Sequence, residues 1–169
     1  MLMPKKYSKE SGLTLIELLV AIGIFGMVVT MAVGIFVIAI TSQRRVIALR
    51  NVEDNVRFAL ELMAREMRTG VNFSGGGNGV SFTNANMQSV VYRLSGGVIE
   101  KSIDGGLSFF VVTGSEVTIN YLNFYLSGQT PGDGLQPRVT VTMSASSQVG
   151  NQTINLKIQT MVSSRFLQI

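Results

Sequence analysis

The sequence predicts an α+β fold, in which a long N-terminal helix packs against a C-terminal antiparallel β-sheet. Residues 18–40 are mostly apolar, and residues 41–69 carry apolar side chains at three- and four-residue steps, which is the spacing of an amphipathic helix. Residues 70–169 contain short runs in which apolar and polar side chains alternate, as in strands with one buried face. The expected parts are a leader at 1–12, an apolar helix at 13–40, its amphipathic continuation at 41–69 and a β domain at 70–169.

The composition limits the classes of function. The chain has 169 residues and is 46% hydrophobic, which suits one small domain plus a membrane segment. Its formal charge of +4 is spread along the chain, so no concentrated basic face is expected and direct binding of nucleic acid is not predicted. The chain contains no Cys and no His, which excludes disulfides, thiolate and imidazole metal ligands, and Ser-His-Asp or Cys-His catalytic groups. We therefore expect no enzyme, no cofactor and no metal site.

The apolar run at 18–40 is long enough to cross a hydrocarbon layer of about 30 Å as a helix. It exceeds the apolar core of about 7–15 residues in a secretory signal peptide, and no small-residue cleavage site follows it. The helix is therefore expected to stay in the mature protein. Lysines precede the run and arginines follow it, so the charge bias does not fix its orientation.

Glu17 is an acid at the start of this apolar run. A carboxylate inside a membrane segment is costly, and it usually marks the position of a partner group. The alternative is that Glu17 lies near the interface and extends its carboxylate to water.

Residues 12–24, GLTLIELLVAIGI, resemble the processing site of type IV prepilins and type II secretion pseudopilins. The resemblance implies that a prepilin peptidase cuts between Gly12 and Leu13 on the cytoplasmic side, and that the new N-terminus on Leu13 is methylated. Leu13 stands where the commonest residue of the family is Phe. The resemblance covers about 30 residues in detail and is only general beyond them.

The same resemblance implies a role for Glu17 in assembly. After cleavage the Leu13 ammonium is four residues away, about 6 Å along the helix axis, and the resemblance implies that the carboxylate pairs with the amine of a neighbouring subunit. The implied partners are other pilin or pseudopilin subunits, the inner-membrane assembly platform, and membrane lipid before assembly. The implied location is the cytoplasmic (inner) membrane, crossed once with the C-terminal domain outside the cytoplasm, and then a pilus or pseudopilus. Residues 58–70 are loosely similar to minor members, the pseudopilin J and pilin W groups.

Gly23, Gly26 and Gly34 interrupt the apolar run without GxxxG spacing. They reflect the ordinary tolerance of membrane helices for glycine, or else Gly26 to Gly34 is a stretch that can loosen when the helix leaves lipid for a filament core.

The amphipathic stripe is expected to lie mostly under the chain's own sheet, with residues 44–50 covered by neighbouring subunits. Two pairs in the favourable i,i+4 order, Glu53 with Arg57 and Glu61 with Arg65, are expected to support the helix. The apolar positions of the stripe are Leu49, Val52, Val56, Ala59, Leu60, Met63 and Met67.

The glycine-rich segment 70–79 lacks the pattern of a phosphate-binding loop and is predicted to be a flexible connection from helix to strand. Gly96 and Gly97 are predicted to form a two-residue hairpin turn. Strands are expected at 80–83, 89–94, 98–102, 108–112, 116–126, 138–144 and 153–162.

Two groups in the β domain are candidate sites. Asp104, Glu116 and Asp133 offer oxygen ligands of the kind that Ca²⁺ prefers, but both aspartates precede glycines, so turn chemistry is the favoured interpretation. The aromatic group is expected in the core or on the strand surface rather than in a stacking platform; its members are Tyr92, Tyr121, Phe124 and Tyr125.

Two hypotheses follow. In the first, the chain is a structural subunit, more specifically a minor one, of a type IV pilus or type II secretion pseudopilus that is processed after Gly12 and assembles through its apolar helix. In the second, it is a single-pass anchor that holds an extracytoplasmic β domain, which binds a ligand without assembling. The junction between Gly12 and Leu13, together with Glu17, distinguishes them.

Overall fold

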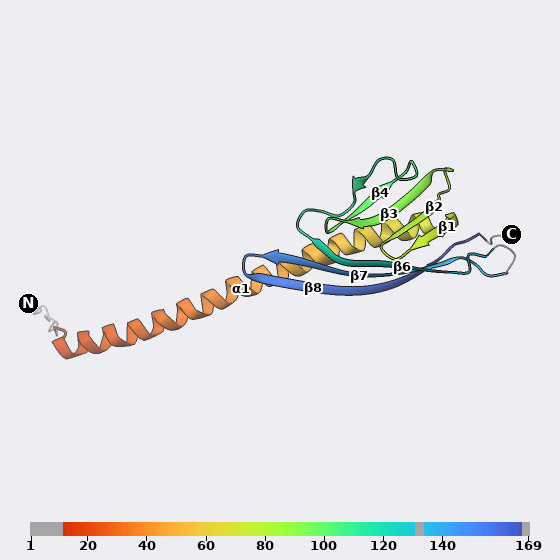
Figure 1. Cartoon of the computed structure of the whole chain (residues 1–169). Coiled ribbons are helices and arrows are strands. Elements are labelled where there is room, and N and C mark those ends of the chain that lie inside the picture. The colour runs from red at the N-terminus through yellow and green to blue at the C-terminus, as the bar shows by residue number, and fades with distance from the viewer. Residues whose placement is uncertain (1–11, 131–133, 167–169) are drawn as a thin grey trace, which may run out of the picture. The chain divides into compact units, whose positions relative to one another are not determined.

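The computed structural model describes residues 12–130 and 134–166. The chain forms two compact units, residues 1–42 and 43–169, and each is described by itself (Figure 1). Helix α1 (Leu15–Arg68) begins in the first unit and ends in the second, and eight strands follow it in the described part of the chain. The predicted α+β class, with one long helix followed by antiparallel strands, is confirmed.

The first unit consists of the apolar part of α1. Its side chains are exposed almost throughout, and none of the most apolar 18-residue window is buried against the rest of the chain. This is the helix of the structure that is long and apolar enough to cross a membrane. Its Thr30 hydroxyl donates to the carbonyl oxygen of Gly26 at 2.8 Å, so this polar group is satisfied within the helix itself.

In the second unit, α1 buries one stripe of side chains against the sheets. Ala48 is fully buried, whereas Leu49 is 37% exposed. Leu49 is three residues before Val52, so it lies at the border of the stripe, within the 44–50 stretch that we expect neighbouring subunits to cover. The buried stripe is Ala48, Val52, Val56, Ala59, Met63 and Met67.

The two expected ion pairs on this helix do not form. Among the described residues the salt bridges join Arg93 to Glu100 and Lys101 to Glu66. Exposed pairs at i,i+4 gain only a few tenths of a kcal/mol, so hydration and side-chain entropy compete closely with them.

The first sheet has five antiparallel strands in sequence order. The hairpin at Gly96 and Gly97 is confirmed: both have positive φ, 57° and 79°, and Ser95 pairs with Val98 across the two-residue turn. The strands are β1 (Val71–Gly76), β2 (Gly79–Thr83), β3 (Ser89–Ser95), β4 (Val98–Ser102) and β5 (Phe110–Val111).

Strand β1 corrects the prediction of a flexible connection at 70–79. Its register with β2 shifts between Val71 and Ser74, and Asn72 lies in this irregular stretch with φ 56°. Phe73 is nevertheless buried and stacks on Phe82 with ring centroids 5.3 Å apart. The glycines therefore supply the backbone freedom of an irregular strand, and the aromatic contact fixes it to the core.

The second sheet has three antiparallel strands, β6 (Thr118–Ser127), β7 (Arg138–Val149) and β8 (Gln152–Ser163), in that order. The strands thus divide into two sheets rather than forming one. The sheets meet where Gly77 N–H donates to the Phe124 carbonyl at 3.1 Å and Phe124 N–H donates to the Gly77 carbonyl at 2.7 Å. Within residues 43–169, Figure 1 shows strands of both sheets beside the distal part of α1.

The core of the second unit combines the buried stripe of α1 with the inner faces of both sheets. Tyr92 and Phe124 are buried in it, whereas Tyr121 and Tyr125 are exposed on β6. These positions agree with the expectation of core or strand surface for the aromatic group.

Candidate functional site

The candidate site is the start of α1, because the predicted site residues Gly12, Leu13 and Glu17 all lie there. Gly12, Leu13 and Thr14 precede the helix, and Leu13 is 78% exposed. The peptide bond between Gly12 and Leu13 therefore lies outside regular structure and next to an exposed side chain. The remainder of the predicted leader, residues 1–11, lies outside the described residues.

Thr14 and Glu17 hold the first turn of α1 by reciprocal hydrogen bonds. The Thr14 N–H and the Thr14 hydroxyl both donate to Glu17 Oε2, at 3.1 Å and 3.0 Å. In return, the Glu17 N–H donates to Thr14 Oγ1 at 3.3 Å. This is a capping box, in which two groups three residues apart satisfy N–H groups that have no partner inside the helix.

The capping box places the Glu17 charge at the N-terminal end of the helix, where the helix dipole favours an anion. Oε2 accepts both hydrogen bonds from Thr14, while Oε1 has no hydrogen-bond partner among the described residues. The carboxylate thus keeps one oxygen available for a further donor. Sequence reasoning found Glu17 but missed its link to Thr14, although the spacing of Thr and Glu is the signal for a capping box.

The surroundings of Glu17 are apolar. Glu17 lines a shallow groove of about 320 Å³ on the helix surface together with Ile16, Val20, Ala21 and Ile24. A charge in such a place is well placed to pair with a cation supplied from outside the chain, because few other polar groups compete for it.

The glycines of this unit are not packed against any side chain in the part of the chain that the structure describes. A Cβ atom added to Gly12, Gly23, Gly26 or Gly34 would meet nothing within 4 Å, and these glycines lack the positive φ that would require glycine. A block of processing by a larger residue at Gly12 would therefore not come from a clash with the described residues.

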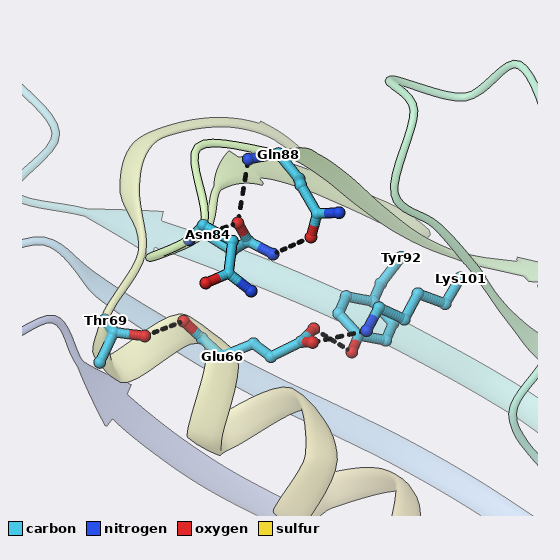
Figure 2. A network of polar contacts seen from close by, with 7 residues as sticks. Glu66, Thr69, Asn84, Gln88, Tyr92 and Lys101 are labelled. Atoms are coloured by element: carbon cyan, nitrogen blue, oxygen red, sulfur yellow. Dashed lines mark hydrogen bonds and ion pairs between the residues drawn. The ribbon is translucent and has the colours of Figure 1, made fainter.

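A second polar group, which sequence reasoning missed, lies in the β domain around Glu66 on α1. Figure 2 shows the Glu66 side chain reaching Tyr92 on β3 and Lys101 on β4. The Tyr92 hydroxyl donates to Glu66 Oε2 at 2.6 Å, and the Lys101 ammonium donates to Oε1 at 2.5 Å. Lys101 is buried and also lies 5.7 Å above the Tyr92 ring.

This network has a structural role in the unit. Both Glu66 oxygens are occupied, and burial, followed by the hydrogen bond to Glu66, raises the pKa of Tyr92 far above its usual range. A tyrosine held in its neutral form and a carboxylate with both oxygens engaged fasten the end of α1 to the five-stranded sheet. The sequence contained a signal for the burial of Lys101. This residue is two positions from the core residue Ile99, so both side chains point to the same face of β4.

Of the acidic residues proposed as Ca²⁺ ligands, Asp104 is held in a turn. Asp104 accepts the Ser102 hydroxyl at 2.6 Å and the N–H groups of Leu107 and Ser108 at 3.0 Å, so turn hydrogen bonds hold the pKa of its carboxyl well below the usual range. Glu116 is exposed before β6, and Asp133 lies outside the described residues. The described ranges 12–130 and 134–166 contain no group of three or more acidic side chains that could hold a metal ion.

Residues 7–33 match the family model of the prokaryotic N-terminal methylation motif. The match includes the capping box and the exposed first part of the apolar helix. No curated protein and no solved structure matches the chain.

Proposed function

We propose that this chain is a structural subunit of a type IV pilus or type II secretion pseudopilus, and that it assembles through its N-terminal helix. The observation that carries the proposal is the N-terminal methylation motif at residues 7–33, which supports a pilin- or pseudopilin-like role. The motif implies processing by prepilin peptidase and assembly with other pilins.

The exposure of the apolar side chains in the first unit supports this role. These apolar side chains have no burial partner among the described residues, so we expect lipid or other helices to cover them. Cleavage between Gly12 and Leu13 creates an ammonium group close to Glu17, whose Oε1 has no partner in the described chain. The amine of a neighbouring subunit fits this position, since opposite charges attract strongly where water is scarce.

The role is structural rather than enzymatic, as the motif suggests. Before assembly, the apolar helix fits a single-pass anchor in the inner membrane, and we place the β domain outside the cytoplasm. The loose similarity of residues 58–70 to J- and W-type members supports a minor subunit.

The test is the intact mass of the protein extracted from cells with and without an active prepilin peptidase. The proposal expects loss of residues 1–12 and addition of one methyl group, both dependent on the peptidase. Gly12→Ala should retain the leader, while Gly34→Ala should be processed, because a Cβ has equal free space at both positions. Retention of residues 1–12 in cells with active peptidase would instead favour a plain membrane anchor.

A further inference from the structure

Strand β8 is a free edge of the three-stranded sheet. The sheet order is β6, β7, β8, and β6 is joined to the first sheet at Gly77, whereas β8 pairs only with β7 in the described chain. All twelve residues of β8 pair with β7 without a register shift.

The register decides which backbone groups of β8 face the open side. Ser164 N–H donates to the Pro137 carbonyl at 2.9 Å, so even-numbered residues bond toward β7 and odd-numbered residues point away from it. The two-residue turn after Val149 gives the same alternation, because the pair that flanks such a turn is hydrogen-bonded. The outward residues are Thr153, Asn155, Lys157, Gln159, Met161 and Ser163.

Within the described chain, the outward N–H and C=O groups of these six residues make no hydrogen bond to another segment. Immediately after the strand, the next outward group does find a partner, since Arg165 N–H donates to the Arg68 carbonyl at 2.8 Å. The open edge thus ends where the chain meets the end of α1, and the preceding row of groups has the spacing that an added strand requires.

Three apolar side chains lie at the first half of the open edge. A groove of about 530 Å³ lies between α1 and the start of β8, and it is lined by Val46, Leu49 and Ile154 together with Arg45, Thr153 and Asn155. Val46 is 47% exposed, and Ile158, which shares the inner face of β8 with Ile154, is 36% exposed. A strand added to β8 would place every second side chain on this inner face, beside these residues.

Three arginines lie together at the other end of the edge, whereas the groove at the first end includes one, Arg45. Arg65, Arg68 and Arg165 surround a groove of about 400 Å³ together with Glu61. None of the three arginines forms a salt bridge with an acid in the described chain. Arginine suits carboxylates because its planar guanidinium can donate two parallel hydrogen bonds.

The edge carries few of the features that normally prevent strand addition. Strand β8 contains no proline and no bulge, and Lys157 is its single charged residue. The outer strands of the first sheet differ: β1 is distorted by a register shift, and β5 is two residues long.

We propose that the free edge of β8 binds an extended segment of another polypeptide as an added strand. The segment alternates apolar and polar side chains, so that the apolar ones lie against Val46, Leu49 and Ile158. It carries an acidic residue at the end that lies beside Arg65, Arg68 and Arg165. This surface belongs to the second unit and is independent of the amine that we propose for Glu17.

The test uses the full chain in detergent micelles and a fluorescent twelve-residue peptide that alternates valine and threonine and ends in two glutamates, since about twelve residues are needed to reach from the groove at Ile154 to Arg165. We expect saturable binding by fluorescence anisotropy. A peptide of the same sequence, N-methylated on alternate residues so that its pairing edge loses its N–H groups, should bind at least tenfold more weakly. Equal affinity for the methylated peptide, or no saturable binding of the parent peptide up to millimolar concentration, overturns the proposal.

Variants of the chain test the same edge from the other side. Gln159→Pro removes one outward N–H without removing a bond to β7 and should weaken binding about tenfold, whereas Gln159→Thr should leave it within twofold. Arg65→Gln with Arg68→Gln should abolish the preference for the glutamate-ended peptide over a lysine-ended one. If Gln159→Pro disturbs the fold, the methylated peptide on the parent chain still decides the question, and a preference unchanged by the arginine variant contradicts the assigned charge.

Discussion

Thr14 and Glu17 satisfy each other's polar groups at the start of α1, yet they leave Glu17 Oε1 without a partner in the described chain. The same carboxylate can therefore start the helix and also meet a cation from outside. These two roles can be tested separately. The Thr14 hydroxyl takes part in starting the helix, whereas the pairing with an outside cation uses Glu17 Oε1.

Removing the charge of Glu17 should impair assembly without preventing cleavage. In Glu17→Ala, the newly formed Leu13 amine has no counter-charge on a neighbouring subunit, so we expect at least a tenfold decrease of the subunit in sheared filaments. The N-terminal mass should still show loss of residues 1–12. The measurement is quantitative immunoblotting of filament and membrane fractions alongside intact-mass analysis.

Glu17→Gln is the matched control for shape, since its side-chain oxygen can still accept from Thr14 while the charge is absent. We expect it to resemble Glu17→Ala in assembly. Wild-type filament yield from Glu17→Gln would assign the role of Glu17 to hydrogen bonding rather than to charge.

Thr14→Ala should loosen the first helical turn, whereas Thr14→Ser should preserve it. Loss of a threonine cap costs about 1 kcal/mol. We therefore expect hydrogen exchange of the Glu17 amide in detergent micelles to quicken about fivefold, because this amide donates to Thr14 Oγ1. Unchanged exchange in the alanine variant would show that the capping box does not hold the turn in solution.

Lys101→Met should destabilise the second unit. It leaves Glu66 with Tyr92 as its remaining side-chain partner, and removal of one member of a largely buried ion pair costs about 3 kcal/mol. Denaturant unfolding followed by circular dichroism measures the loss. Combining Lys101→Met with Glu66→Gln should recover part of it, because the carboxylate left without its ammonium is then gone; a purely additive double variant would contradict the coupling.

The stability of the second unit should fall at alkaline pH, in part through Tyr92. Its pKa is raised in the folded state, mainly by burial and then by Glu66, so the folded chain holds this proton where the unfolded chain releases it. The contribution is fully present below about pH 10, the ordinary tyrosine value, and is lost as pH rises above it. Unfolding free energies between pH 8 and 11 should decline less steeply for Tyr92→Phe than for the parent, and parallel curves would exclude this role.

Local patterns were sufficient to predict the elements whose signals are strong. The steps between Val52 and Met67 predicted the buried stripe, and Gly96 with Gly97 predicted the hairpin. Strand β1 escaped prediction because three consecutive glycines, Gly75 to Gly77, lower strand propensity, while its anchor is a distant contact between Phe73 and Phe82.

The start of α1 could also be predicted as a site because its signal is local. Glu17 stands out locally as an acid in an apolar run, and its partner Thr14 is three residues away. In the network of Glu66, the partners Tyr92 and Lys101 are 26 and 35 positions further along the chain. The periodicity of a single segment does not predict such distant pairs. The division into two sheets also depends on tertiary contacts, chiefly those between Gly77 and Phe124.

The open space around Gly23, Gly26 and Gly34 has a consequence for mutational scanning. A Cβ added at any of them meets no neighbour among the described residues, so we expect harmful substitutions there to report on lipid or on adjoining molecules. Harmful substitutions along the stripe from Ala48 to Met67 report instead on folding of the single polypeptide. One mutational scan, scored separately for protein abundance and for filament yield, should therefore divide α1 into two segments. Substitutions in the first segment should lower filament yield, and substitutions in the second should lower protein abundance.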